Sequence, residues 1–209
     1  MCYNIIVKNK DYIMTVKTIY VFRHGQTDYN ATRRAMGQMD IPLNETGLNQ
    51  AGELAQKMVN MNIQAIYTSP LQRAMQTAQQ VANKINTNII SNSGLMERNL
   101  GVLQGHIVRE SDNPDEYQMD YEQLQLCMPA KLLENNDWKP DGGESRNECL
   151  RRAQKTIKDI LKKTPYDTIA ISTHTGPMLA ILDLAGGTDK RIGNCDYVKL
   201  IFDGKKFSK

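Results

Sequence analysis

The chain has 209 residues, enough for one domain with an ample hydrophobic core that needs no disulfide or structural metal for stability. Its 26 basic and 23 acidic residues leave a net charge of +3, a mild excess that does not point to nucleic acid or to an anionic membrane surface as a partner. The four cysteines form no C-x-x-C pair and there are only three histidines, so we predict no metal site.

The N-terminus does not resemble a targeting segment. No apolar stretch approaches the ~20 residues that cross a bilayer, so we expect no membrane contact. Residues 1–15 carry polar and charged side chains in place of the apolar centre of a signal peptide. We predict that they are an N-terminal extension to a single domain over residues 16–209, and that the protein is cytoplasmic.

The first part of this domain alternates short apolar runs with amphipathic segments. Val16–Phe22, Ile63–Thr68 and Asn88–Ser91 are short runs rich in β-branched residues, and each predicts a strand. Asn44 is the expected N-cap of a helix between the first two strands. The apolar face of that helix is predicted to consist of Leu48, Ala51, Leu54, Ala55 and Met58.

A second helix is predicted between Ile63–Thr68 and Asn88–Ser91. Ser69 is followed by Pro70 at the first helical position and by Gln72 at the third, which is the pattern of a capping box. Apolar residues at helical spacing then continue to Ile85.

A long polar stretch follows, from Gly94 to Gly143. It lacks regular periodicity, and we expect an insertion over about residues 106–140 to line the functional site, as such segments often do. Short helices are expected around Glu116–Leu126 and Ala130–Asn135. Ser145, with glutamate three residues later, is a second capping box, and its helix should end before Pro165.

Two strands and a helix complete the domain. Thr168–Ser172 and Tyr197–Phe202 predict strands, and Pro177 is the expected start of a short apolar helix that ends at Leu184. Alternating strands and helices indicate an α/β protein. We predict a three-layer α/β/α sandwich with a mostly parallel central sheet and an insertion near the active site.

Polar residues follow several of the predicted strands directly. Arg23, His24 and His174 lie at the carboxyl ends of predicted parallel strands, which is the edge of such a sheet where ligands bind. We therefore expect these three residues to be neighbours. Arg73 follows another strand, and two guanidinium groups can grip phosphate oxygens from two sides. The helix start at Pro177 adds unpaired backbone N–H groups to this site for a small anion.

Such a site suits phosphoryl transfer to a histidine. Clustered arginines stabilise a metaphosphate-like transition state without magnesium, and they keep a nearby imidazole neutral. His24 is the better nucleophile candidate, because Gly25 frees the backbone to approach the ligand and a carbonyl there would fix the tautomer. His174 would hold the transferring oxygens, and Glu97 is the candidate general acid. The alternative is a strand-end histidine that only caps a carbonyl.

These motifs together resemble the histidine phosphatase superfamily, also called the phosphoglycerate mutase-like family. The family signature R-H-G-x-T-x-x-N matches residues 23–30, P-L-x-x-x-G-x-x-Q-A matches 42–51, and S-P-L-x-R-A-x-x-T-A matches 69–78. G-G-E-S matches residues 142–145, and a strand that ends in histidine matches 173–174. The acid-loop motif matches at Leu95, Glu97, Gly101 and Gly105. The motifs run in family order over nearly the whole chain.

The resemblance implies a role for each of these residues. His24 would be the phosphorylated nucleophile, Glu97 the proton donor, and Arg23, Arg73 and His174 the phosphate pocket. It also implies no metal and no cofactor, and a small phosphorylated substrate as the partner. The oligomeric state is open, with a homodimer as one alternative. Further substrate-binding residues would be Gln26, Thr27, Asn30 and Thr175.

Departures from the family pattern bear on the reaction. Thr175 stands where glycine is usual and Met178 where arginine is common, so we expect both to alter the lining of the pocket. The mutase branch has tyrosine at the position of Leu100, lysine at that of Val108, and an arginine pair in the following insertion. None of these is evident here, so we predict a metal-independent phosphomonoesterase. A cofactor-dependent phosphoglycerate mutase and a weakly catalytic phospho-ligand-binding module are the alternatives.

Overall fold

A six-stranded sheet forms the centre of the protein in the computed structural model, which describes residues 16–107, 135–187 and 191–209. The strand order is β3-β2-β4-β1-β5-β6; the first four are parallel and the last two antiparallel to their neighbours. The strands are β1 (Lys17–Arg23), β2 (Ala65–Thr68), β3 (Asn88–Ser91), β4 (Thr168–Thr173), β5 (Tyr197–Phe202) and β6 (Phe207–Ser208). The predicted N-terminal extension and the short helices expected in the insertion fall outside the described residues, apart from Asn135.

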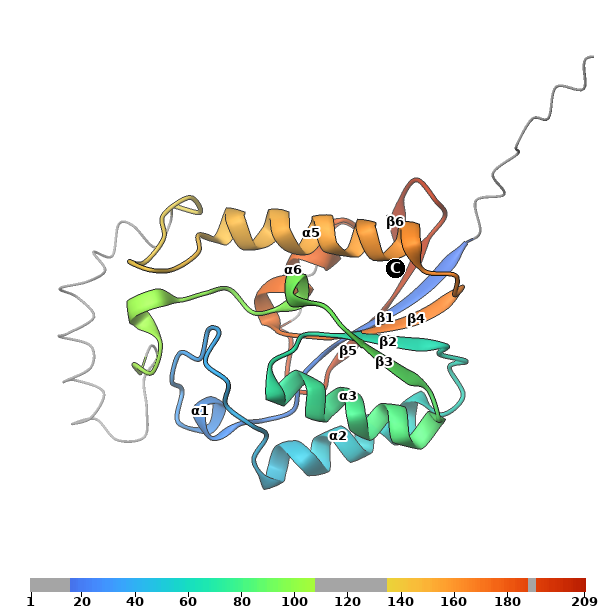
Figure 1. Ribbon diagram of the computed structural model, residues 1–209, viewed down its shortest axis with the longest axis horizontal. Coiled ribbons are helices and arrows are strands. Elements are labelled where there is room, and N and C mark those ends of the chain that lie inside the picture. The colour runs from blue at the N-terminus through green and yellow to red at the C-terminus, as the bar shows by residue number, and fades with distance from the viewer. Residues whose placement is uncertain (1–15, 108–134, 188–190) are drawn as a thin grey trace, which may run out of the picture.

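Helices cover both faces of this sheet (Figure 1), which confirms the predicted α/β fold. The pair α2 (Glu45–Met58) and α3 (Gln72–Ile85) lies on one face, and the pair α5 (Arg146–Lys163) and α6 (Thr175–Asp183) on the other. Alternate side chains of β1 serve the two layers: Ile19 belongs to the apolar core on the α5/α6 side, and Phe22 to the core on the α2/α3 side. Within the described residues no helix is both long and apolar enough to cross a membrane.

Two of the predicted helix starts are confirmed. The side chain of Asn44 accepts a backbone hydrogen bond from the first turn of α2. Ser145 and Glu148 form a reciprocal capping box at α5, and that helix ends before Pro165. The prediction for Leu48 is wrong, because this side chain is 43% exposed in the first turn of α2.

The start of α3 differs from the prediction. The helix begins at Gln72 with Leu71 at the N-cap, and no side chain caps it. Ser69 therefore does not close a capping box. Its hydroxyl oxygen accepts from the N–H of Leu71 at 3.3 Å and also lies 2.8 Å from Nε2 of His174, on a segment 105 residues away.

The start of α6 also lies earlier than predicted. The helix begins at Thr175, with His174 at the N-cap, and Pro177 occupies its third position. Proline is tolerated there because the first backbone N–H groups of a helix have no intrahelical acceptor.

Strand register brings the chemistry-bearing residues to one edge. Arg23 pairs with Thr173 in the β1–β4 ladder, and Thr68 pairs with Ser172 in the β2–β4 ladder. The next residues of the three parallel strands, which include two histidines, therefore meet at their carboxyl ends. Three short helices also lie in the chain segments near this edge: α1 (Asp28–Ala31), η1 (Ser93–Leu95) and η2 (Gly101–Leu103).

Candidate active site

Two histidine rings lie side by side at the carboxyl edge of the sheet. The ring centroids of His24 and His174 are 5.1 Å apart, with the ring planes tilted by 57°. Both residues are almost completely buried, with 2% and 0% exposure. The prediction that these two segments, 150 positions apart in the sequence, come together is confirmed.

The His24 ring is held in one tautomer by its own backbone. Its Nδ1 lies 2.7 Å from the carbonyl oxygen of Gly25, and a carbonyl only accepts, so Nδ1 carries the hydrogen. Burial holds the pKa of His24 well below its usual value, and the charges of Arg73 and Arg23 lower it further against the Gly25 hydrogen bond. His24 is therefore a neutral imidazole with a lone pair on Nε2.

Gly25 allows a close approach of backbone to backbone. A Cβ atom at Gly25 would meet the carbonyl group of Gly47 in the first turn of α2, and one at Gly47 would meet the backbone of Gln26. The glycine after His24 thus admits the helix α2, whereas the sequence suggested that it admits the ligand. This contact fixes the chain that follows the nucleophile candidate.

His174 is oriented by a hydroxyl group. Its Nε2 is 2.8 Å from Oγ of Ser69, while its buried Nδ1 has no hydrogen-bond partner among the described residues. Burial lowers the pKa of His174 well below its usual value, and the charges of Arg73, His24 and Arg23 lower it further. One nitrogen of a neutral ring is thus left for a ligand.

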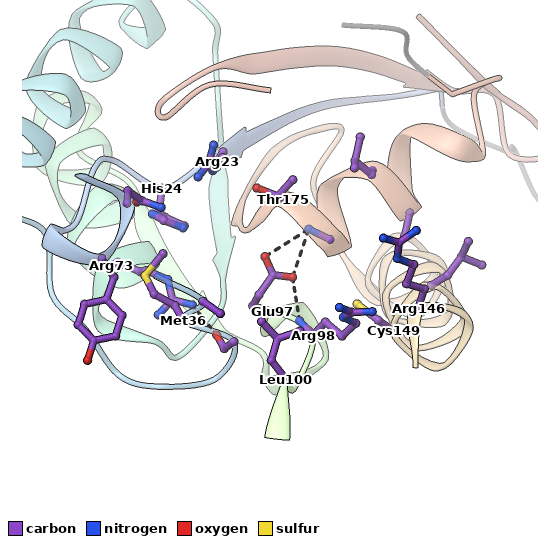
Figure 2. Close-up of a pocket in the computed structure, with 18 of the residues that line it drawn as sticks. Arg23, His24, Met36, Arg73, Glu97, Arg98, Leu100, Arg146, Cys149 and Thr175 are labelled. Atoms are coloured by element: carbon purple, nitrogen blue, oxygen red, sulfur yellow. Dashed lines mark hydrogen bonds between the residues drawn. The ribbon is translucent and has the colours of Figure 1, made fainter. Parts of the chain in front are cut away.

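Two arginines stand beside these rings. Arg73 is completely buried and donates from Nη1 to the carbonyl of Met39 (2.7 Å) and from Nη2 to that of Gly37 (2.8 Å). Burial lowers its pKa to about 10, so it remains charged at neutral pH. Arg23 donates from Nη1 to the carbonyl of Ile192 at 2.9 Å. Both guanidinium groups line the same cavity (Figure 2).

The chain before β5 holds the backbone of the nucleophile candidate. The N–H of Cys195 donates to the carbonyl oxygens of Arg23 (3.2 Å) and His24 (3.3 Å). Asn194 donates from Nδ2 to the His24 carbonyl at 3.0 Å. Nothing in the sequence predicts this contact, because the two segments are about 170 residues apart and no motif marks the second.

The side chain of Glu97 contacts the first turn of α6 (Figure 2). Its carboxylate accepts from the N–H of Gly176, at 3.2 Å to Oε1 and 3.3 Å to Oε2, and from the N–H of Arg98 at 2.8 Å. A helix N–H that was expected to serve a bound anion therefore serves the candidate acid. Any Cβ at Gly176 would press on Oε1 of Glu97, so the glycine makes this approach possible.

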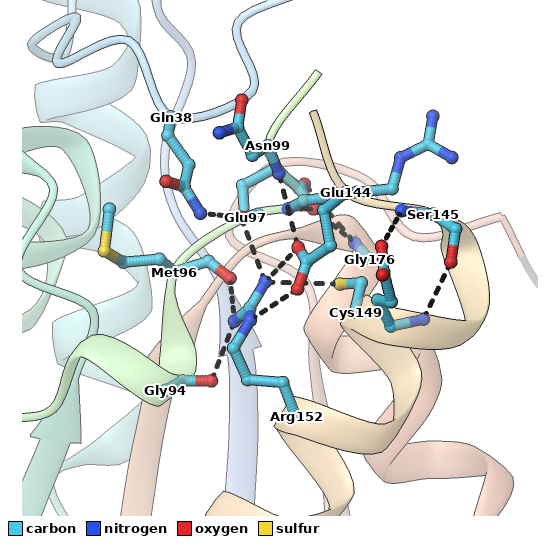
Figure 3. A network of polar contacts seen from close by, with 12 residues as sticks. Gln38, Gly94, Met96, Glu97, Asn99, Glu144, Ser145, Cys149, Arg152 and Gly176 are labelled. Carbon is cyan, nitrogen blue, oxygen red and sulfur yellow. Dashed lines mark hydrogen bonds and ion pairs between the residues drawn. The ribbon is translucent and has the colours of Figure 1, made fainter. Parts of the chain in front are cut away.

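An arginine–glutamate pair fixes the loop that carries Glu97 (Figure 3). Arg152 donates from Nε and Nη2 to the two carboxylate oxygens of Glu144, at 2.8 and 2.6 Å. It also donates to the carbonyl oxygens of Gly94 (3.0 Å), Met96 (2.8 Å) and Glu97 (3.2 Å). Burial lowers the pKa of Arg152, but the hydrogen bond to Glu144 and the electrostatic interactions with Cys149, Glu144 and Glu97 together outweigh this, so the pKa is raised overall. The only hint in the sequence is Glu144 within G-G-E-S.

The four lesser candidates separate into two pairs. Asn30 and Thr175 line the cavity. Thr27 is fully buried and caps α1, where its hydroxyl accepts from the N–H of Asn30, and Gln26 accepts through Oε1 from Asn44 at 3.0 Å. Neither Thr27 nor Gln26 is among the cavity residues, so both support local structure and make no contact with the cavity.

The residues that depart from the family pattern differ in their position relative to the cavity. Met178 is completely buried in the core on the α5/α6 side and does not line the cavity, so the expectation for this residue is wrong. Thr175 and Leu100 do line it. Val108 falls outside the described residues.

The completely buried His174 is not among the lining residues, whereas Arg23, His24, Arg73 and Glu97 line one cavity of about 1030 Å³. Its charged lining is strongly cationic. Of the described residues that line it, two are acidic, Glu97 and Asp183, whereas seven are arginines: Arg23, Arg33, Arg34, Arg73, Arg98, Arg146 and Arg191. The cavity is therefore suited to a polyanionic ligand.

A buried thiol also borders the cavity. Burial raises the pKa of Cys149 to about 12, and the nearby charge of Glu97 contributes, so this thiol stays protonated and is a poor nucleophile. Across residues 16–107, 135–187 and 191–209, no three histidine, cysteine, aspartate or glutamate side chains gather closely enough to hold a metal ion.

Comparison with known proteins agrees with this geometry. The family model described as histidine phosphatase superfamily (branch 1) matches residues 19–208. "Phosphoglycerate mutase-like protein 4" from Arabidopsis thaliana is 29% identical over 201 residues, which are 91% of this chain and 82% of that protein. "Probable phosphoglycerate mutase GpmB" from Yersinia pestis is 34% identical over 144 residues, 69% of this chain. That match spans 63% of the GpmB sequence.

A solved structure is similar over almost the full length. A mycobacterial glucosyl-3-phosphoglycerate phosphatase superposes with a TM-score of 0.73 at 25% identity, covering 92% of this chain and 95% of the other. The names of these similar proteins thus include both mutases and a phosphatase.

Proposed function

The chain belongs to the histidine phosphatase superfamily, and we propose that it is a phosphomonoesterase that hydrolyses a small phosphorylated metabolite through a phosphohistidine at His24. The observation that carries this proposal is the state of His24: a neutral ring beside two arginines, with Nδ1 bonded to the Gly25 carbonyl. Attack on phosphorus requires a nitrogen lone pair, and Nε2 supplies it.

In this proposal the phosphoryl group binds between Arg23, Arg73 and His174. The two guanidinium groups pair with its oxygens and stabilise the charge of the transition state, so the protein's own cations take the place of a metal. With the Ser69 hydroxyl as the donor to Nε2 of His174, Nδ1–H of the same ring is left to donate to a phosphoryl oxygen.

Glu97 acts twice in the proposed reaction. In the first step the bond from His24 Nε2 to phosphorus forms, the ester P–O bond breaks, and protonated Glu97 gives its proton to the leaving alkoxide. In the second step the Glu97 carboxylate takes a proton from water, whose oxygen attacks phosphorus and releases His24 and inorganic phosphate. A positioned acid and base of this kind contributes about 10²–10⁴-fold.

We propose hydrolysis and not the mutase reaction because of the side chain of Leu100. Leu100 lines the cavity where the resemblance places a tyrosine in the mutase branch, so this polar group is missing from the lining. The GpmB similarity favours the second candidate, a cofactor-dependent phosphoglycerate mutase.

The experiment that separates these reactions measures two products. Purified protein with a chelator should release phosphate from 4-nitrophenyl phosphate, and the His24→Ala variant should not. Conversion of 3-phosphoglycerate to 2-phosphoglycerate, stimulated by 2,3-bisphosphoglycerate and without phosphate release, would identify a mutase. Tight binding of a phosphorylated ligand without either reaction would identify a binding module.

A further inference from the structure

Two arginines face the cavity beyond the candidate acid. In Figure 2, Arg23, His24 and Arg73 lie on one side of the Glu97 carboxylate, and Arg98 and Arg146 lie on the other. Both of the latter line the cavity. A phosphomonoester with its phosphorus at His24 and its ester oxygen at Glu97 would extend its leaving group towards this second pair.

Neither guanidinium group of this pair serves the fold. In the described parts of the chain, no hydrogen bond or ion pair joins the side chain of Arg98 or Arg146 to another group. Arg152, six residues further along α5, shows the contrast, because its guanidinium group is fully engaged by Glu144 and three carbonyls.

The two groups also lie close enough to repel one another. Burial lowers the pKa of Arg98, and the positive charge of Arg146 lowers it further, although the carboxylates of Glu97 and Glu144 oppose this. Like charges held together at a cavity wall are stabilised by an anion between them, and guanidinium groups match carboxylate and phosphate oxygens equally well.

We infer that Arg98 and Arg146 bind a second anionic group, a carboxylate or a phosphate, on the leaving group of the substrate. The substrate class is then phosphomonoesters that carry a second anion. This inference rests on the proposed function, because the orientation of the ester is taken from His24 and Glu97.

Matched substrate pairs test it. 3-Phosphoglycerate and glycerol 3-phosphate differ by a carboxylate against a neutral hydroxymethyl group, and fructose 1,6-bisphosphate and fructose 6-phosphate differ by a second phosphate. We expect kcat/KM for phosphate release to be about 10–100-fold higher for the charged member of at least one pair. The responding pair tells whether the second anion is a carboxylate or a phosphate.

Arginine variants connect that preference to the site. The Arg98→Gln/Arg146→Gln double variant should lose most of the ratio between charged and neutral substrates. The control is Arg151→Gln, which removes an exposed arginine from the same helix and should keep the ratio.

Two results would overturn the inference. One is hydrolysis of 4-nitrophenyl phosphate without preference in either pair, which would leave the proposed function intact. The other is a preference that survives in the double variant. If no substrate is hydrolysed, the proposed function fails, and the same pairs are then titrated calorimetrically into the His24→Ala protein. Equal affinity of the His24→Ala protein for the charged and neutral members would refute the second-anion site.

Discussion

The carboxylate of Glu97 accepts two hydrogen bonds, at 3.2 and 3.3 Å, from the backbone N–H of Gly176. Gly176 is the second residue of α6, and His174 is the N-cap of the same helix. The start of one helix therefore positions both the candidate acid and one wall of the phosphate pocket. The position of the Glu97 carboxylate relative to His174 therefore depends on Gly176, which has no side chain to hold the carboxylate away.

Replacing that glycine should displace the acid without unfolding the protein. In Gly176→Ala the new Cβ would press on Oε1 of Glu97, which is the movable end of a long side chain. We expect kcat for an alkyl phosphate to fall about 10²-fold, and for 4-nitrophenyl phosphate to fall less, because its leaving group needs little help from an acid. Steady-state kinetics on both substrates measure this difference.

Gly52→Ala is the matched control. A Cβ at Gly52, within α2, would meet no atom within 4 Å. This variant should keep full activity and gain about 0.5–1 kcal/mol of stability from helix propensity. Full activity of Gly176→Ala on the alkyl phosphate would show that Glu97 is not the proton donor.

The Arg152–Glu144 pair should support both the fold and the acid. Glu144→Gln removes the charge from a hydrogen-bonded pair whose side chains are 25% and 16% exposed, and we expect a loss of about 1–3 kcal/mol of stability. Because Arg152 also holds the carbonyl of Glu97, kcat should fall while KM changes little. Urea unfolding and steady-state kinetics measure the two effects.

An exposed ion pair on the same helix provides the comparison. Asp159→Asn removes the partner of Lys155 at the surface, where the pair is solvated, so neither stability nor kcat should change measurably. An unchanged kcat in a destabilised Glu144→Gln protein would limit the role of the pair to folding.

The two buried histidines should make the protein less stable in mild acid. The pKa values of His24 and His174 are both held well below the ordinary value of about 6.5. As the pH falls below about 6.5, the unfolded chain therefore takes up protons that the folded protein does not. The free energy of unfolding should then fall by up to about 1.4 kcal/mol per pH unit for each histidine, and should be unaffected by them above that pH.

Urea unfolding at pH 7.5, 6.5 and 5.5 measures this dependence. The His24→Gln variant should lose about half of the slope between pH 6.5 and 5.5. A flat dependence in the unmodified protein over this range would mean that the rings are charged in the folded state, and an unaltered slope in the variant would mean that His24 does not contribute.

Much of the architecture follows from local sequence pattern. The strand runs predict the sheet, and the rule that parallel strands present their carboxyl ends at one edge is sufficient to bring His24 and His174 together. Asn44 and Ser145 cap their helices as expected, because a cap is a contact over a few residues. Ser69 does not follow this rule, because α3 begins only at Gln72; its hydroxyl contacts the N–H of Leu71 and Nε2 of His174.

The details of the site depend on contacts that no local pattern contains. Gly176 accommodates Glu97 from a segment 79 residues away, and Arg152 reaches the carbonyl of Glu97 across 55 residues. The direction in which Arg98 and Arg146 point is likewise set by packing in three dimensions. Sequence pattern could therefore propose the phosphate pocket, but not the groups that position the acid or that face the leaving group.

The central claim is a covalent phosphate on His24, and rapid quenching during turnover tests it most directly. Protein mixed with 4-nitrophenyl phosphate is quenched before the first turnover is complete, and the mass of the intact chain and of its peptides is measured. We predict one phosphoryl group on His24 that disappears as the substrate is consumed, and none on the His24→Ala protein. Turnover with no phosphoryl group on His24, or with the group on another residue, would contradict it.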